Sequence, residues 1–179
     1  MNVGILTLSD KGSRGERKDT SGAAIGELLA PLGATIRRAE ILPDDLESIA
    51  ATLGAWSDSG ELDLIVTTGG TGLAPRDVTP EATLRVVDRL APGLAELMRA
   101  EGLRHTSMAA LSRAVVGMRG RTLIVNLPGS ERGVRQNLAV LLPLLPHAVE
   151  TLRGAAGDHI AEGAATKAPG QPESATKRS

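Results

Sequence analysis

Two hydrophobic patterns alternate along most of the chain. Short runs of branched apolar residues, such as residues 3–9, are typical of buried strands. Between them lie longer stretches in which apolar residues recur every three to four positions, as on one face of a helix. These patterns predict strands at residues 3–9, 34–42, 62–70, 114–118 and 122–129. They predict helices at residues 20–33, 43–56, 79–90, 92–102 and from residue 130 onward.

The order of these elements predicts the fold class. Strands that alternate with helices favour a mostly parallel sheet with helices on both faces, a three-layer α/β domain. The strands at 114–118 and 122–129 are joined by a short turn, so we expect a short antiparallel element at one edge of the sheet. Pro143 and Pro146 are expected to break or kink the last helix. We expect one domain over residues 1–154 and a disordered tail over residues 155–179, which are small, polar and charged.

Composition and charge narrow the class of protein. The chain has 179 residues, of which 41% are hydrophobic, as expected for one folded domain. The formal net charge of −1 gives no basic field for nucleic acid. No apolar run reaches the ~18 residues that span a bilayer, and the apolar start is too short for a signal peptide. We therefore expect a cytoplasmic protein with small-molecule substrates and neither nucleic acid nor membrane as a partner.

Several kinds of chemistry are excluded by missing residue types. The chain has no cysteine, which excludes disulfides, thiolate metal sites and cysteine nucleophiles. It has no Phe or Tyr, so the aromatic side chains that stack on single-stranded nucleic acid are missing. Trp56 has helical spacing with apolar neighbours and is expected in the core. The three histidines lack metal-ligand spacing, which argues against a zinc site or a histidine-based triad.

Small, polar and acidic residues follow four of the predicted strands. Ligands bind beyond the carboxyl ends of the strands in an open parallel sheet, so these residues are expected to converge there. They are Ser9 and Asp10; Asp44; Thr68, Gly69, Gly70, Thr71 and Gly72, with Arg76 and Asp77 after them; and Asn126, Pro128, Gly129 and Ser130.

The glycine-rich loop at residues 68–72 has two readings. Glycines let backbone N–H groups approach an anion closely, and Thr68 and Thr71 add hydroxyl donors, which favours a phosphate cradle. A tight turn between a strand and a helix would use the same residues. No Gly-Lys-Ser/Thr follows, so the loop is not that of an ordinary P-loop nucleotidase.

Asp77 and Arg76 favour the phosphate reading. A carboxylate beside a phosphate is repelled unless a cation lies between them, and Mg²⁺ prefers one or two carboxylates together with substrate phosphates. Asp44, at the neighbouring strand end, is the natural second carboxylate, and Arg76 has the planar fork that suits a phosphate. The alternative is that Asp77 only caps the next helix, where Thr79 fits the N-cap, and that Arg76 is a solvated surface residue.

Two further segments carry weaker signals. Ser130 is predicted at a helix N-terminus, where free N–H groups favour an anion, although an ordinary capped helix would look the same. Ser112 and Arg113 precede a strand, at its amino end, where a solvated arginine is the default.

Taken together, these motifs resemble the Mog/MoaB-type molybdopterin-binding proteins of molybdenum cofactor synthesis. The resemblance covers roughly residues 3–154. It rests on "LSD", "DTSG", "LPDD", "TTGGTG", "PRDVTPEAT", "APGLAELMR", "LSRA" and "LIVNLPGS".

The resemblance implies a reaction and roles for residues. It implies Mg²⁺-dependent transfer of AMP from ATP to the phosphate of molybdopterin, with release of pyrophosphate, by a homotrimer that hands its product to a metal-insertion protein. It places the key acids and metal ligands at Asp44 and Asp77. It places substrate- and phosphate-binding groups at Ser9, Asp10, Thr68, Gly69, Gly70, Thr71, Gly72, Arg76, Ser112, Arg113, Asn126, Pro128, Gly129 and Ser130.

The subgroup has two signals that point in different directions. The Arg76-Asp77 pair and "LPDD" resemble the Mog-type adenylyltransferases, whereas "NLPGS" resembles the MoaB type. The alternatives are a MoaB-like protein that binds molybdopterin without adenylylating it, a module of a larger competence-damage-type nucleotide enzyme, and a structural trimer with a vestigial site.

Overall fold

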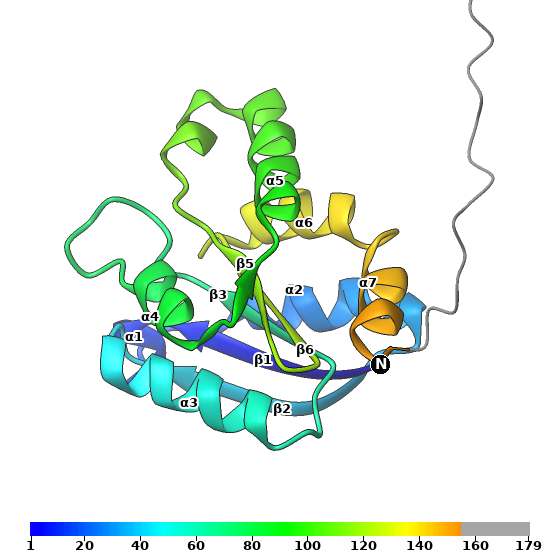
Figure 1. Ribbon diagram of the computed structural model, residues 1–179. Helices are drawn as coiled ribbons and strands as arrows, with labels where there is room; N and C mark the ends of the chain where they lie inside the picture. The colour runs from blue at the N-terminus through cyan, green and yellow to red at the C-terminus, as the bar shows by residue number, and fades with distance from the viewer. Residues whose placement is uncertain (155–179) are drawn as a thin grey trace, which may run out of the picture.

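The computed structural model describes residues 1–154 and contains one six-stranded sheet (Figure 1). Its strand order is β2-β1-β3-β6-β5-β4. The first four are parallel, and β5 and β4 pair antiparallel at the other edge, as the sequence predicts. The strands are β1 (Asn2–Leu8), β2 (Thr35–Leu42), β3 (Leu64–Thr68), β4 (Arg89–Leu90), β5 (Val116–Arg119) and β6 (Thr122–Leu127).

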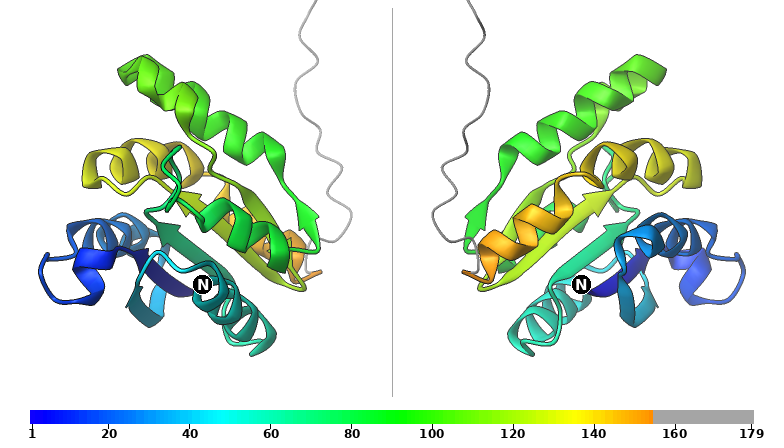
Figure 2. Two further views of the ribbon diagram at one scale, coloured as in Figure 1. Left: turned by 90° about the vertical axis from the view of Figure 1, so that its left-hand side faces the viewer. Right: turned by 90° about the vertical axis from the view of Figure 1, so that its right-hand side faces the viewer.

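Helices cover both faces of the sheet and make three layers (Figure 2). One hydrophobic cluster joins the sheet to α2, α5, α6 and α7, and a second joins the opposite face to α3 and α4. Alternate residues of β1 enter the two clusters, because successive side chains of a strand point to opposite faces. The helices are α1 (Asp10–Ser13), α2 (Thr20–Leu29), α3 (Leu46–Asp58), α4 (Thr79–Val86), α5 (Pro92–His105), α6 (Glu131–Leu141) and α7 (Leu145–Leu152), with 3₁₀ turns η1 (Ala30–Leu32) and η2 (Ser107–Leu111).

Trp56 lies in the second cluster, as predicted, and is 3% exposed. A Cβ on Gly4 of β1 would lie 2.8 Å from the indole ring. Glycine at this position therefore lets α3 pack its largest side chain against the middle of the sheet.

The predicted helix 79–90 is shorter in the structure. It ends at Val86, Val87 is extended, and Arg89–Leu90 forms the edge strand β4. The backbone N–H of Asp88 donates to Met118 O at 2.8 Å, and that of Ala91 donates to Val116 O at 2.8 Å. Pairing with β5 thus replaces helical hydrogen bonds that β-branched Val86 and Val87 support only weakly.

Other boundaries also differ from the prediction. The expected loop after β1 contains the short helix α1, and the helix predicted from residue 43 begins at Leu46, with Asp45 as its N-cap. Asp44 therefore stays outside the helix. The C-terminal helix breaks between α6 and α7 around Pro143, as predicted. The predicted disordered tail, 155–179, lies outside the described residues. None of the helices in residues 1–154 is long and apolar enough to cross a bilayer.

Candidate active site

The carboxyl ends of β1, β2, β3 and β6 meet at one edge of the sheet. The chain passes from β1 to β2 on one side and then returns to β3 on the other, so a crevice opens between β1 and β3. Short contacts tie the loops together: Gly69 N donates to Leu127 O at 3.2 Å, and Thr68 Oγ1 donates to Pro128 O at 2.7 Å. The fold thus brings together the strand ends that the sequence singled out.

The glycine-rich loop has its carbonyl groups bonded to the protein. Four consecutive carbonyls accept hydrogen bonds from α4 or from the segment before β5. The N–H groups of residues 70–73 have no hydrogen-bond partner in the part of the chain that the structure describes. The bonds are Thr79 Oγ1 to Gly69 O (2.9 Å), Thr79 N to Gly70 O (3.2 Å), Arg113 N to Thr71 O (3.0 Å) and Arg113 Nε to Gly72 O (2.7 Å).

This arrangement corrects the prediction that Thr79 caps α4. Thr79 is the first residue of the helix and is fully buried, and the N-cap position is Val78, which makes no side-chain cap bond. The Thr79 hydroxyl fixes the loop instead. Fixed carbonyls and unpartnered N–H groups leave partial positive charge for an anion, as in other backbone anion sites.

Only glycine fits at the centre of the loop. Gly69 and Gly70 have φ angles of 105° and 61°, which residues with a side chain adopt at a cost. A Cβ on Gly69 would lie 2.3 Å from Leu8 O, and a Cβ on Gly70 would lie 2.3 Å from Thr79 Oγ1. These glycines are therefore required by both backbone conformation and close packing.

Two carboxylates flank the loop. A Cβ on Gly70 would lie 3.2 Å from Asp44 Oδ1, and a Cβ on Gly72 would lie 2.8 Å from Asp77 Oδ2. Asp77 Oδ2 also accepts from Ala74 N at 2.8 Å, which fixes the direction of the carboxylate. Both predicted acids therefore lie beside the loop whose N–H groups are unpartnered.

A third carboxylate adds to the negative charge. Asp10 Oδ1 accepts from Asp44 N at 3.2 Å, Asp44 Oδ2 accepts from Asp10 N at 3.3 Å, and Arg76 forms an ion pair with Asp10. Burial raises the pKa of the Asp44 carboxyl; the Asp10 amide and Arg76 oppose this, and the carboxylates of Asp10 and Asp77 add to it. A cation at this position would relieve the repulsion.

Mg²⁺ suits this donor set better than a cation that needs a full protein cage. No cluster of three acidic or histidine ligands is preformed among the described residues. Asp44 and Asp77 are two hard oxygen donors beside a loop suited to phosphate, and Mg²⁺ is held by one or two carboxylates together with substrate phosphates and water.

Several predicted hydroxyl groups have structural partners. Ser9 Oγ accepts from Gly12 N at 3.0 Å and Ser130 Oγ accepts from Gly133 N at 3.1 Å, so each caps a helix. The Thr68 hydroxyl holds Pro128, as described above. Each of these hydroxyl groups makes a hydrogen bond within the protein and thereby fixes a loop at the site.

The structure does not bring the Asn126 side chain to the surface of the site. Asn126 is fully buried, and its Nδ2 donates to Thr67 Oγ1 at 3.0 Å and to Thr83 Oγ1 at 2.9 Å. Its Oδ1 accepts from Val115 N at 3.2 Å. Asn126 thus links β6, β3, α4 and the start of β5 beneath the site.

A cavity of about 380 Å³ is lined by both acids and by Thr68, Gly69 and Gly70 of the glycine-rich loop. Its lining includes two basic residues that sequence reasoning missed, Arg17 and Lys18, which directly precede the N-cap of α2. Asp19, the N-cap residue, accepts from Thr7 Oγ1 at 2.6 Å. Their position in the sequence, just before the N-cap of α2 and soon after β1, could have indicated that they lie at the site.

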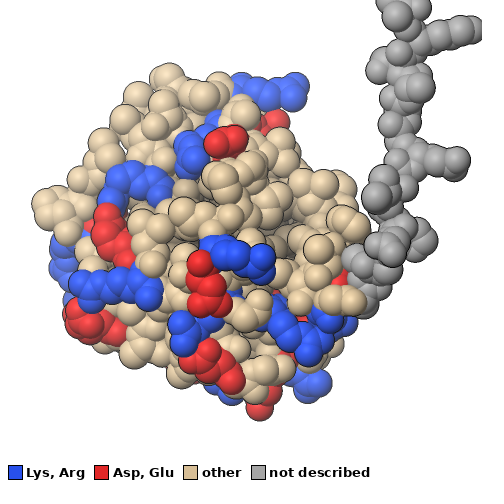
Figure 3. All heavy atoms as spheres, in the orientation of Figure 1, with Lys and Arg blue, Asp and Glu red and all other residues tan. Residues whose placement is uncertain are grey.

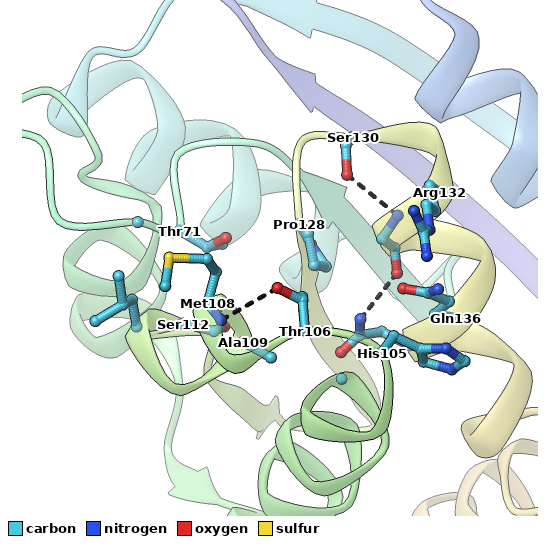
Figure 4. A pocket seen from close by; sticks show the side chains of 15 residues that line it. Thr71, His105, Thr106, Met108, Ala109, Ser112, Pro128, Ser130, Arg132 and Gln136 are labelled. Carbon is cyan, nitrogen blue, oxygen red and sulfur yellow. Dashed lines mark hydrogen bonds between the residues drawn. The ribbon is translucent and has the colours of Figure 1, made fainter.

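A second cavity of about 520 Å³ lies on the other side of the loop, between α6 and the α5–η2 segment (Figure 4). Thr71 and Ser112 line it on one side, and Arg132 and Gln136 of α6 line it on the other. Ser130 lines both cavities. The glycine-rich loop therefore stands between two hollows, which suits a reaction between two ligands.

Comparisons with known proteins agree with this geometry. The family model described as "Probable molybdopterin binding domain" matches residues 4–147. A molybdopterin adenylyltransferase of Helicobacter pylori (strain J99 / ATCC 700824) is 40% identical over 156 residues, which cover 86% of this chain and 89% of that protein.

Two further relatives differ in length and in name. A crystal structure of the molybdopterin biosynthesis enzyme MoaB from Thermus thermophilus is 58% identical, with a TM-score of 0.81, and the match covers 86% of this chain and 96% of that chain. The Drosophila melanogaster molybdenum cofactor synthesis protein cinnamon is 42% identical over 85% of this chain but only 26% of its own length. Given the family match over most of its length, this chain belongs to the molybdopterin-binding-domain family.

Proposed function

We propose that this chain is a molybdopterin adenylyltransferase that acts in molybdenum cofactor biosynthesis. The observation that carries the proposal is the loop at residues 70–73, whose N–H groups are unpartnered in the described chain and which lies between the carboxylates of Asp44 and Asp77. The name of the Helicobacter pylori relative supports the same reaction. We take residues 1–154 as the catalytic domain.

In this reaction a phosphate oxygen of molybdopterin attacks the α-phosphorus of ATP. The bond between that phosphorus and the oxygen bridging to the β-phosphate breaks, and pyrophosphate leaves. The attacking oxygen is already anionic near neutral pH, so no strong general base is needed. The reaction can therefore proceed although no histidine is placed as a general base among the described residues of the site.

The task of the protein is to hold two polyanions together in line. The N–H groups of residues 70–73 would stabilise phosphate oxygens, and Arg17 and Lys18 would attract the nucleotide into the smaller cavity. Asp44 and Asp77 would hold Mg²⁺, which neutralises phosphate charge when bound. The larger cavity beyond Ser130 leaves room for the second substrate.

Three features of the biological setting are part of the proposal. Assembly into a homotrimer is one of them, and the exposed apolar side chains Leu90, Leu97 and Leu103 are proposed as part of the contact between subunits. The much longer cinnamon relative supports a hand-over of the product to another cofactor-synthesis protein. Use of ATP supports a cytoplasmic location.

The test is pyrophosphate release from Mg-ATP with and without molybdopterin. We expect release only when both are present. Pyrophosphate release at the same rate without molybdopterin, or no pyrophosphate release by the folded protein, would contradict the proposed reaction.

A second candidate is a protein that binds molybdopterin without adenylylating it. The sequence Gly129-Ser130-Glu131 and the 58% identity to the MoaB structure favour it. Tight binding of molybdopterin by the wild-type protein, together with no pyrophosphate release, would select this candidate.

A further inference from the structure

The side chain of Arg113 joins the two ends of the loop at residues 72–77. Its Nε donates to Gly72 O at 2.7 Å, and its Nη2 donates to Asp77 O. Its backbone N–H also donates to Thr71 O at 3.0 Å. One residue, from the segment before β5, thus fixes the exit of the glycine-rich loop and the backbone of a carboxylate beside it.

The loop has few other attachments. Leu73 is 62% exposed and the Arg76 side chain is 68% exposed. The bonds from Asp77 N to Ala74 O, at 2.9 Å, and from Ala74 N to Asp77 Oδ2, at 2.8 Å, close a turn within the loop without joining it to the rest of the protein. Among residues 1–154, the remaining side-chain link is the ion pair of Arg76 with Asp10, and an exposed arginine holds a position only weakly.

The guanidinium of Arg113 is already committed to the protein. Its Nη1 pairs with Glu81 Oε1 in the first turn of α4, so each of its three nitrogens donates to a protein oxygen. The Glu81 side chain is 44% exposed as a whole, yet its Oε2 is buried and has no partner among the described residues. Three of the five guanidinium N–H groups are therefore used within the protein, which fixes the orientation of the side chain.

We infer that Arg113, oriented by Glu81, is a positioning residue that holds Asp77 in place for nucleotide chemistry. Its rigid fork reaches Gly72 and Asp77 at once, which a single ammonium group does not. The inference deepens the proposed function and rests on it, because it assigns Arg113 to placing a catalytic carboxylate and not to binding phosphate directly.

A kinetic double-mutant cycle tests this role. We expect Arg113→Met to lower kcat for pyrophosphate release by about 10- to 100-fold, as for a reacting group displaced by about 1 Å, with less than about a threefold change in KM for ATP. In an Asp77→Asn background the same change should cost less than about threefold, because the carboxylate that Arg113 places is gone. Arg113→Lys should restore little of the activity.

A direct phosphate contact predicts other results. A large rise in KM for ATP would overturn the positioning role. So would a fall in kcat of about 10- to 100-fold when Arg113→Met is added to the Asp77→Asn variant. Arg119→Met is the matched control. Arg119 is the last residue of β5, and its guanidinium donates to the Asp58 carboxylate and to Val86 O. This variant should therefore keep the wild-type kcat.

Hydrogen exchange provides a readout that needs no activity. The amides of Ala74 and Asp77 should exchange about tenfold faster in Arg113→Met than in the wild type, whereas amides of β3 should not change. Unchanged exchange at both amides would contradict the anchoring of this loop by Arg113, even if activity falls. Faster exchange in Arg113→Met, together with a wild-type protein that releases no pyrophosphate, would support the anchoring role of Arg113 and contradict the proposed reaction.

Discussion

Backbone groups, more than side-chain bases, make up the candidate site. The loop from Gly69 to Gly72 directs its carbonyls to Thr79 and Arg113, and the N–H groups of Gly70, Thr71 and Gly72 have no partner in the described chain. Asp44 and Asp77 then add charge of the opposite sign beside it. The proposed site would bind phosphates through backbone dipoles and a shared cation, and such binding needs neither a nucleophilic side chain nor a histidine pair.

Asp77→Asn tests the proposed cation site. The variant keeps the size of the side chain and an oxygen that accepts from Ala74 N, but it loses the charge. We expect kcat for pyrophosphate release to fall about 100-fold, and the Mg²⁺ concentration for half-maximal rate to rise, as for loss of one electrostatic group. Asp58→Asn, at an exposed ion pair with Arg119, is the control. Wild-type Mg²⁺ dependence in Asp77→Asn would rule out the metal role.

Gly70→Ala tests the fit of the loop, and Gly120→Ala provides a matched control. Both glycines have positive φ, 61° and 54°, so each alanine should lower the free energy of unfolding by about 1–2 kcal/mol, measured by denaturant titration. Gly70→Ala should cost more than Gly120→Ala, because its Cβ would also lie 2.3 Å from Thr79 Oγ1. Only the Cβ at residue 70 meets atoms of the site, because nothing lies within 4 Å of a Cβ at residue 120. We expect nucleotide binding and turnover to be lost in Gly70→Ala and retained in Gly120→Ala. Equal activity in the two variants would contradict the loop's role.

Strand ends and helix starts place these residues. Ser21 Oγ donates to Gly129 O at 2.9 Å, and Thr68 Oγ1 donates to Pro128 O, so α2 and β3 together fix the loop after β6. At the opposite edge of the sheet, Asp63 before β3 accepts from Asn2 N at 2.6 Å and from Arg153 Nη2 at 2.6 Å. This second link ties the end of α7 to the start of the sheet.

The link at Asp63 makes stability depend on pH. Burial tends to raise the pKa of this carboxyl, but its bonds to Arg153 and to the Asn2 amide outweigh burial and hold the pKa below its usual range. A depressed pKa adds stability above the unfolded pKa of about 3.9, and this stability is lost as pH falls through the folded value. Asp63→Asn should therefore cost about 1–3 kcal/mol at pH 7. Its difference from the wild type, measured by urea titration, should shrink below about pH 4. A difference that is constant with pH would contradict this account.

The alternation of strands and helices sufficed to predict the layers, the parallel sheet and the antiparallel edge. It did not predict β4, because two residues that pair only with β5 carry no period of their own. The convergence of Asp44, Gly70 and Asp77 followed from the rule on strand ends. The roles of Thr79, Asn126 and Arg113 could not be predicted in this way. A sequence does not show whether a hydroxyl, amide or guanidinium group faces a ligand or a neighbouring protein group.

The arrangement of charge and apolar surface over the protein fits a small-substrate enzyme. On the face shown in Figure 3, basic and acidic side chains are interspersed and do not form a field of one sign. The larger exposed apolar side chains include Leu90, Leu97, Leu103 and Met108, on β4, α5 and η2. Leu90, Leu97 and Leu103 are the side chains proposed for contact between subunits.

Sedimentation or light scattering tests the proposed trimer. We expect a mass about three times the 18.5 kDa of one chain. Replacing Leu97 and Leu103 together by Arg should shift the protein to monomer, because two charges would be buried at the contact. Leu144→Arg, a change at another exposed leucine, between α6 and α7, is the control. A monomeric wild type, or a trimer that survives the double change, would contradict this interface.

The most direct measurement follows labelled phosphate from ATP to molybdopterin. The wild-type protein is incubated with Mg²⁺, molybdopterin and ATP labelled at either the α- or the γ-phosphate, and the pterin product is isolated. The proposed reaction predicts label on the pterin from α-labelled ATP only, with γ-label in pyrophosphate. Label from γ-labelled ATP on the pterin, or no label from either while molybdopterin stays tightly bound, would contradict adenylyl transfer at this site.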